Sequence, residues 1–162
     1  MLKKYLKKEI NKIPMNLNEA GKSLIKSFEG CKLKAYKCSA NKDTIGYGNT
    51  FYEDGTKVKV GDIITKERAD ELFEIIAEDF SNKVAPLIKK ELTDNNFSAL
   101  VSFAYNAGVG NLKNSTLLKK VNANPEDETI RAEFMKWVRA GGKVLAGLER
   151  RRKAEADLYF KP

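Results

Sequence analysis

Histidine is absent from this chain of 162 residues, and cysteine, proline and tryptophan are rare, with two, four and one copies respectively. The absence of imidazole removes histidine as a general base and removes the commonest ligand of transition metals. Any chemistry must then use carboxylates, thiols, hydroxyls or backbone groups. We expect no metal site and no other cofactor.

Long hydrophobic runs are also missing, because no apolar stretch approaches the roughly 20 residues that a membrane-spanning helix needs. Residues 1–14 contain too many lysines for a secretory signal peptide. For the two cysteines, Cys31 and Cys38, the reducing cytosol favours free thiols, although a disulfide between them is possible in principle. These absences predict a soluble protein with no signal peptide and no integral membrane association.

The charge balance is strongly positive. Lysine and arginine number 30 and aspartate and glutamate 22, which gives a net charge of +8 and a pI near 9.4. Such a field favours an anionic partner: nucleic acid, an acidic membrane face, or a cell wall with acidic peptides and polymers. No helix-turn-helix or zinc motif is recognisable, so we expect no nucleic-acid partner.

Apolar residues recur with the helical period in several segments, and local signals mark where each helix begins and ends. A short basic helix is expected within residues 1–14, and a second helix over 17–29 with Asn16 or Asn18 as its cap. Four more are expected: from Thr65 to near Pro86, from Thr93 or Asp94 to Gly108, from Asn124-Pro125 to Gly141-Gly142, and from Glu149 to about Phe160.

Between about residues 30 and 64 the pattern changes to β-forming residues mixed with turn residues. Asp54-Gly55 lies between two such runs, which is typical of a hairpin turn. We therefore predict an α+β fold, in which a small antiparallel sheet is joined by a long helix to a larger helical lobe over about 65–162. Residues 1–162 are expected to form one domain, with 1–15 as a basic extension.

Glu29 is the first candidate for a chemical role. It ends an apolar helical stripe and precedes Gly30, where the chain must turn. A carboxyl group at such a place is partly desolvated, which suits an acid that keeps its proton near neutral pH. Most glutamates at helix ends are simply solvated, so the case for Glu29 depends on its sequence context.

That context resembles the active-site signature of the phage lysozymes, the endolysins of T-even and lambdoid phages. The matching segments are Phe28-Glu29-Gly30, Leu33-Lys34-Ala35-Tyr36, Thr44-Ile45-Gly46-Tyr47-Gly48-Asn49-Thr50, Ala99 to Gly108, Phe134, Trp137, Arg139 to Gly142, Leu148, Arg150 to Arg152 and Ala154-Glu155. They follow the family order over nearly everything from 17 to 160. The resemblance implies a lysozyme-like fold and a muramidase, an enzyme that hydrolyses peptidoglycan glycan strands.

The resemblance places the family's catalytic triad on Glu29, Cys38 and Thr44. It implies that Glu29 protonates the leaving group, that Thr44 holds the attacking water, and that the anomeric carbon is inverted. Where this chain has Cys38, the commoner family residue is aspartate. Where it has Asn49, the family usually has a histidine thought to serve local structure, so we expect that departure to affect stability more than activity.

Cys38 has two interpretations. A free thiol has a pKa of about 8.5, so little thiolate exists at neutral pH unless neighbours such as Lys37 and Lys42 lower it. Cys38 either positions or activates water at the triad position, or is a small side chain that only packs. Asp43 could supply the missing carboxylate, yet neighbours on a strand point to opposite faces. If Thr44 faces the cleft, Asp43 therefore faces away.

The resemblance also implies residues that bind substrate: Thr50, Tyr105, Asn106, Thr116 and Arg150. For Tyr105 the alternative is plain core packing, and for residues 150–152 it is a solvated helix face. Arg150 is the arginine expected to reach Glu29. Gly46 and Gly48 are expected to let the backbone approach a sugar chain, or simply to form a bulged strand.

These observations predict an endolysin-type muramidase that is monomeric and needs no cofactor. It is expected to wait in the host cytoplasm until the membrane is permeabilised, and then to act on the peptidoglycan of the periplasm or cell wall. The alternative is a non-catalytic peptidoglycan-binding protein on the same scaffold, because the second carboxylate is missing.

Overall fold

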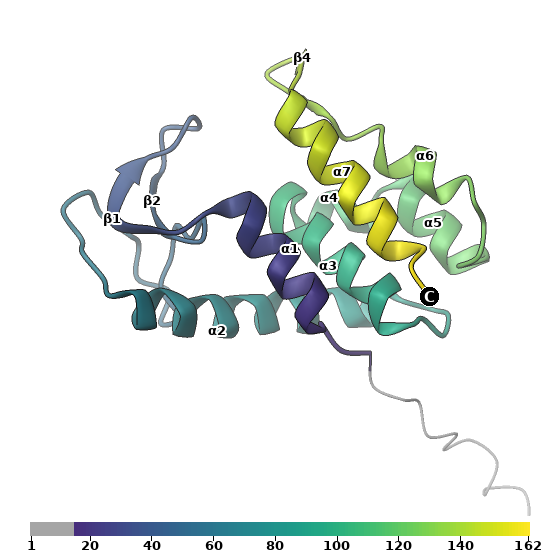
Figure 1. Ribbon diagram of the computed structural model, residues 1–162, viewed down its shortest axis with the longest axis horizontal. Helices are drawn as coiled ribbons and strands as arrows, with labels where there is room; N and C mark the ends of the chain where they lie inside the picture. Colours follow the sequence, from purple (N-terminus) through teal and green to yellow (C-terminus); the bar gives the residue numbers. More distant parts are fainter. Residues whose placement is uncertain (1–14) are drawn as a thin grey trace, which may run out of the picture.

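The computed structural model describes residues 15–162, so the helix expected within 1–14 lies outside the described residues. The elements follow one another along the chain from purple to yellow in Figure 1. In order they are α1 (Glu19–Glu29), β1 (Lys32–Lys37), β2 (Asp43–Gly46), α2 (Lys66–Val84), the 3-10 turn η1 (Ala85–Leu87), α3 (Asp94–Ala107), α4 (Val109–Lys113), α5 (Thr116–Ala123), α6 (Ile130–Phe134), β3 (Arg139–Ala140), β4 (Lys143–Val144) and α7 (Ala146–Tyr159).

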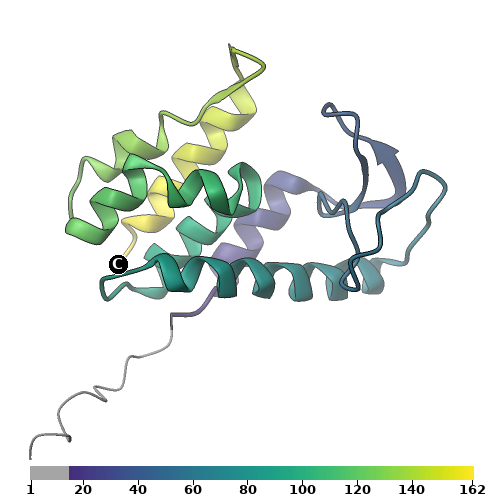
Figure 2. The ribbon, with the colours of Figure 1, turned by 180° about the vertical axis from the view of Figure 1, so that it is seen from behind.

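The long helix α2 connects a small β lobe to a larger group of helices. Figures 1 and 2 show it running along one side of the molecule, from β1 and β2 to the helices around α3. Its apolar residues pack into both lobes: Leu72 contacts Ile45 and Val58 of the β lobe, while Val84 belongs to the helical core. The predicted α+β architecture, a small antiparallel sheet joined by a long helix to a helical lobe, is confirmed.

Side-chain caps fix the starts of three predicted helices. The Asn18 side chain accepts a hydrogen bond from the backbone N–H of Gly21, Thr65 caps α2 in the same way, and Thr93 forms a capping box with Asn96 at the start of α3. These bonds satisfy backbone donors that a helix start leaves without partners. The first helix begins two residues later than predicted because Asn18, rather than Asn16, is its cap.

The β lobe is built on an antiparallel pair. Lys32 pairs with Gly46 and Tyr36 with Thr44, and the register shifts between these two pairs. The expected hairpin at Asp54-Gly55 is present as a turn, in which the Gly55 N–H donates to the Tyr52 carbonyl, with a single bridge between Phe51 and Lys57. The β1–β2 turn and the loop through Phe51 therefore lie on the same small lobe.

The helical lobe has α3 at its centre. Eight consecutive residues of α3, 97–104, are buried, and the helix packs against α1, α2 and α7. Around it lie Leu117 and Val121 of α5, Phe134 of α6 and Tyr159 of α7. The helices α4 and α5 were not predicted from the sequence. Since α1 and α7 both rest on α3, residues at their facing ends are brought together.

The prediction of one helix from Asn124-Pro125 to Gly141-Gly142 was wrong. The Asn124 side chain accepts from the Glu126 N–H and the Asp127 side chain from the Thr129 N–H, so these side chains close local turns in place of a helical turn. Only the five residues of α6 are helical. Gly141 and Gly142, with φ of 57° and 78°, form the turn of the β3–β4 hairpin.

The last helix begins at Ala146, three residues before the predicted Glu149, and ends at Tyr159. Within residues 15–162, no helix combines the length and the apolar character that crossing a membrane requires.

Candidate active site

Glu29 is the last residue of α1, and Gly30 ends the helix with φ of 66°. The Glu29 side chain is 18% exposed, and its Oε1 lies 2.6 Å from Nη1 of Arg151 on α7. The sequence analysis expected Arg150 to make this contact, and that expectation was wrong. Arg150 is exposed, whereas Arg151 points back to α1 and is 4% exposed. The carboxyl group is thus held where α1 and α7 meet.

A buried network holds Arg151 in turn. Its Nε donates to Oε1 of Glu155 at 3.1 Å, and its Nη2 donates to the carbonyl oxygen of Ser102 at 3.3 Å. The Ser102 hydroxyl donates to the same Glu155 oxygen at 2.9 Å. Glu155 is fully buried. Because α3 and α7 supply all these groups, the orientation of Arg151 toward Glu29 depends on the core of the helical lobe.

Arg152 is a second fully buried arginine next to this network. Its Nη2 donates to Oδ1 of Asn106, its Nε lies 3.4 Å from Oε2 of Glu155, and its guanidinium carbon lies 4.8 Å from the ring centroid of Phe103. Among the described residues, its Nε and Nη1 and the Glu155 Oε2 have no hydrogen-bond partner. Burial raises the pKa of Glu155 and lowers the pKa of Arg152. The network therefore brings the carboxyl group of Glu155 and the guanidinium groups of Arg151 and Arg152 together in the protein interior, away from water.

Gly48 lies directly against the Glu29 carboxyl group. A Cβ atom at this position would be 2.5 Å from Oε2 and 3.2 Å from Cδ of Glu29, and Gly48 has φ of 77°. Both the close approach and the backbone conformation require glycine. The sequence offers two explanations for Gly48, access for a sugar chain and a bulged strand. Neither identifies the closest neighbour of Gly48, which is the carboxyl group of Glu29.

Cys38 begins the turn between β1 and β2. Hydrogen bonding with the Lys42 backbone, the Thr44 side chain and the Ala40 backbone lowers the pKa of the Cys38 thiol, and the Thr44 hydroxyl itself donates to the Lys42 carbonyl at 2.9 Å. The charges of Lys37 and Lys42, invoked from the sequence, are not among the largest causes of this shift, and the Lys37 ammonium lies 2.8 Å from Oδ1 of Asp43. Both cysteines are free thiols. The turn therefore favours the thiolate form of Cys38 by local hydrogen bonds.

Tyr36 connects the two halves of the candidate site. It is the register partner of Thr44 in the sheet. After burial, the negative charges of Cys38 and Glu29 raise the pKa of Tyr36, so both groups lie within electrostatic reach of its hydroxyl. From the sequence, Tyr36 is predicted only as part of the family motif and has no role of its own. Tyr36 is thus the sheet partner of Thr44 and senses the charges of Cys38 and Glu29.

Tyr105 joins the β lobe to α3. Its hydroxyl donates to the Tyr47 carbonyl at 2.6 Å and accepts from Nδ2 of Asn49 at 3.0 Å, while Oδ1 of Asn49 accepts from the Tyr47 N–H. Its ring packs 5.0 Å from that of Phe80. Asn49 therefore completes a link between the lobes. Burial is the main cause that raises the pKa of Tyr105.

The remaining residues predicted to bind substrate are Thr50, Asn106, Thr116 and Arg150. Within residues 15–162, no hydrogen bond or ion pair joins Thr116 or Arg150 to Glu29, Cys38 or Thr44, and both residues are exposed. Asn106 is engaged with Arg152. Thr50 lines a cavity of about 560 Å³ together with Gly48 and Tyr105. Among the described residues, no group of three or more His, Cys, Asp or Glu side chains is placed to hold a metal ion.

Residues 26–155 match the Phage lysozyme family. The endolysin of Bacillus phage B103 is 44% identical over 148 residues, which cover 90% of this chain and 54% of that protein. The chain thus spans about half the length of this curated relative. The endolysin of Acyrthosiphon pisum secondary endosymbiont phage 1 is 41% identical over 152 residues, with 90% of this chain and 98% of that protein covered.

Among solved structures, the endolysin from Escherichia coli O157:H7 phage FAHEc1 has a similar fold. It is 38% identical in sequence and superimposes with a TM-score of 0.82, and the match covers 90% of this chain and 94% of that chain. The similarity extends over both lobes described above.

Proposed function

The chain belongs to the phage lysozyme family, and from this premise we propose that it is a muramidase of the endolysin type. The proposed reaction is hydrolysis of the β-1,4 bonds between N-acetylmuramic acid and N-acetylglucosamine in bacterial peptidoglycan. The observation that carries this proposal is the partly buried Glu29 carboxyl group, held 2.6 Å from Arg151, with Cys38 and Thr44 on the β1–β2 segment of the β lobe. A pair of groups on two sides of a sugar is the arrangement that glycoside hydrolysis needs.

In the proposed mechanism, Glu29 donates its proton to the glycosidic oxygen as the bond from that oxygen to the anomeric carbon breaks. Water attacks the anomeric carbon from the opposite face and gives its proton to the Cys38 thiolate, while the Thr44 hydroxyl positions the water. The product is inverted at the anomeric carbon. Once Glu29 has lost its proton, the Arg151 guanidinium at 2.6 Å stabilises the carboxylate.

The proposed function is tested by digesting purified peptidoglycan and analysing the released fragments by mass spectrometry and NMR. A muramidase creates new reducing ends on N-acetylmuramic acid, and inversion gives the α anomer first. A protein that only binds peptidoglycan creates none, and this result would remove the proposed reaction. We further propose that the protein acts as a single domain and a monomer, on the cell wall, after the host membrane has been permeabilised.

Three substitutions at Cys38 test whether its side chain acts as a base, by comparing the activities of the variants. Cys38→Asp keeps substantial activity, because the carboxylate can accept the proton. Cys38→Ser loses some, because the hydroxyl can still hydrogen-bond the water although it is not a base, and Cys38→Ala loses most, because neither function remains. Since the thiol must be ionised, wild-type activity falls as the pH drops through the lowered pKa of Cys38. In Cys38→Asp this acid limb moves down toward the carboxyl range, about pH 4. The measurement is the pH profile of kcat/KM for each variant.

Cys31→Ala is the matched control, since Cys31 is the other free thiol and packs in the apolar cluster around Phe73. Its pH profile should keep the wild-type acid limb. Full activity of Cys38→Ala at every pH would mean that the thiol takes no part in the reaction.

A methyl group at Gly48 is expected to displace the Glu29 carboxyl group. The Cβ of Gly48→Ala would lie 2.5 Å from Oε2, and a displacement of about 1 Å can cost on the order of a hundredfold in rate. The positive φ adds a loss of about 1 kcal/mol in the free energy of unfolding. The measurement is kcat, together with urea unfolding.

Gly55→Ala provides the matched control for this glycine. Gly55 has φ of 84°, similar to that of Gly48, yet no atom lies within 4 Å of a Cβ built there. Gly55→Ala should therefore lose a similar amount of stability and keep its kcat. Equal kcat values for the two variants would contradict the role assigned to Gly48.

A further inference from the structure

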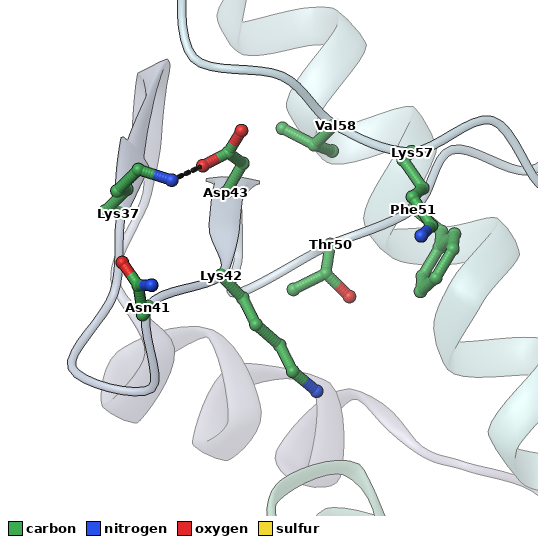
Figure 3. Close-up of a pocket in the computed structure, with 8 residues that line it drawn as sticks. All are labelled: Lys37, Asn41, Lys42, Asp43, Thr50, Phe51, Lys57 and Val58. Carbon is green, nitrogen blue, oxygen red and sulfur yellow. Dashed lines mark hydrogen bonds and ion pairs between the residues drawn. The ribbon is translucent and has the colours of Figure 1, made fainter.

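The β lobe contains a cavity of about 410 Å³ that the proposed reaction does not use. It lies between the β1–β2 turn and the loop from Thr50 to Val58, as Figure 3 shows. A cavity of this size falls in the range of small-ligand sites. Its lining residues are Lys37, Asn41, Lys42, Asp43, Thr50, Phe51, Lys57 and Val58.

Both rims of the cavity are fixed by backbone hydrogen bonds. In the β1–β2 turn, the Asn41 N–H donates to the Cys38 carbonyl at 2.8 Å and the Cys38 N–H to the Lys42 carbonyl at 2.9 Å. On the other side, the Val58 N–H donates to the Thr50 carbonyl at 3.0 Å. The cavity is therefore formed without any rearrangement of these two segments.

The charges in the cavity are not balanced. Asp43 is fully engaged, since its Oδ1 lies 2.8 Å from the Lys37 ammonium and its Oδ2 accepts from the Val60 N–H at 3.1 Å. The ammonium groups of Lys42 and Lys57 make no hydrogen bond or ion pair within the part of the chain that the structure describes. The lining thus offers two unpaired positive charges to an incoming group.

An exposed aromatic ring stands beside these charges. Phe51 is 47% exposed, although burying a phenylalanine side chain stabilises a protein by about 1.5–3 kcal/mol. The Thr50 hydroxyl and the Asn41 amide add hydrogen-bonding groups to the same lining. An apolar ring, an amide, a hydroxyl and two ammonium groups together suit a sugar that carries a carboxylate.

We propose that this cavity is an accessory subsite that binds the carboxylates of the peptide stem on a glycan strand, with the attached sugar resting on Phe51. The proposal rests on the proposed function. The cavity adjoins the candidate active site at two residues: Thr50 lines both this cavity and the one with Gly48 and Tyr105, and the Lys42 carbonyl accepts from the backbone N–H of Cys38 at 2.9 Å. A strand bound at the active site therefore reaches the cavity along the β lobe.

The test measures binding separately from catalysis by using Glu29→Gln protein, in which the proposed acid is removed. The first probe is a soluble tetrasaccharide of alternating N-acetylglucosamine and N-acetylmuramic acid with its acidic peptide stems. The second is the same compound with every peptide carboxylate converted to a methyl amide. Dissociation constants are measured by isothermal titration calorimetry at low salt, where exposed charges are least screened.

Adding Lys42→Ala and Lys57→Ala together should raise the dissociation constant of the acidic probe about fivefold and leave that of the neutral probe unchanged. Lys89→Ala with Lys90→Ala is the matched control. These two exposed lysines remove the same charge from the helical lobe, and the affinity for both probes should stay the same.

The subsite is overturned if the acidic probe binds equally well to Glu29→Gln protein with and without the Lys42 and Lys57 substitutions. The proposed function still stands in that case if the wild-type protein creates reducing ends. An equal loss in the Lys89/Lys90 control also overturns the subsite, because net charge would then explain the effect. The subsite is also overturned if the Glu29→Gln protein binds neither probe. The proposed function is overturned as well only if the wild-type protein creates no reducing ends in the peptidoglycan digest.

Discussion

Glu29→Gln is expected to lower the rate of peptidoglycan hydrolysis about a thousandfold, because a positioned general acid contributes on the order of 10²–10⁴ in rate. Glutamine keeps the size of the side chain and can still contact Arg151, but it has no proton to give to the leaving oxygen. The measurements are the loss of turbidity of permeabilised Gram-negative cells and the release of reducing ends from purified peptidoglycan. The variant should bind the substrate with little change.

Glu91→Gln is the control for this substitution, since Glu91 is an exposed glutamate of the helical lobe outside the proposed mechanism. It should clear cells at the wild-type rate. Clearing that survives Glu29→Gln would remove the proposed mechanism, whatever the substrate. Clearing of cells by wild type and variant alike, with no reducing ends released by either, would favour the non-catalytic binding protein.

Glu155→Leu is expected to lower the free energy of unfolding by about 3 kcal/mol, because it leaves the buried Arg152 without its carboxylate partner. Glu155 is fully buried, and its two oxygens face the guanidinium groups of Arg151 and Arg152 at 3.1 and 3.4 Å. The free energy of unfolding of Glu155→Gln should lie between those of the wild-type and Glu155→Leu proteins, since the amide keeps one acceptor but loses the charge. Urea unfolding of the three proteins gives the comparison.

Two further variants separate the charge effect from a packing effect. Asp157→Asn, on the same helix, removes an acid whose ion pairs with Arg131 and Lys153 are half exposed, so it should cost less than about 1 kcal/mol. Adding Arg152→Met to Glu155→Leu should restore part of the loss, because the unpaired buried charge is removed. A Glu155→Leu protein as stable as wild type would show that the carboxylate does not balance the arginines.

The helix starts at Asn18, Thr65 and Thr93 could be predicted because each depends on a side chain and a backbone N–H three residues away. The segment from Asn124 to Gly142 could not. Its proline and acids favour a helix start, but the same polar side chains also close short turns, and the sequence does not decide between these outcomes. The burial of Ile130 and Phe134 in the core stabilises the short helix α6.

In the candidate site, too, one contact could not be predicted from the sequence. The resemblance identified Glu29, Cys38 and Thr44, but it did not decide which of three consecutive arginines reaches Glu29. Successive helix residues point about 100° apart, so the choice depends on how α7 packs on α3. A local signal was available: Glu155 lies four residues after Arg151 and three after Arg152, a spacing that places all three on one face. Arg150 does not share that spacing.

The ion pair between Glu29 and Arg151 joins residues 122 positions apart, which has a consequence during protein synthesis. At about 5–20 residues per second, a ribosome adds the arginine roughly 6–24 s after the glutamate. For that interval the nascent polypeptide carries the acid without its cationic partner, and α7 does not yet exist to orient it. The contact between the proposed acid and Arg151 can therefore form only once translation has reached α7, and we expect a prematurely terminated product that lacks this helix to lack the proposed activity.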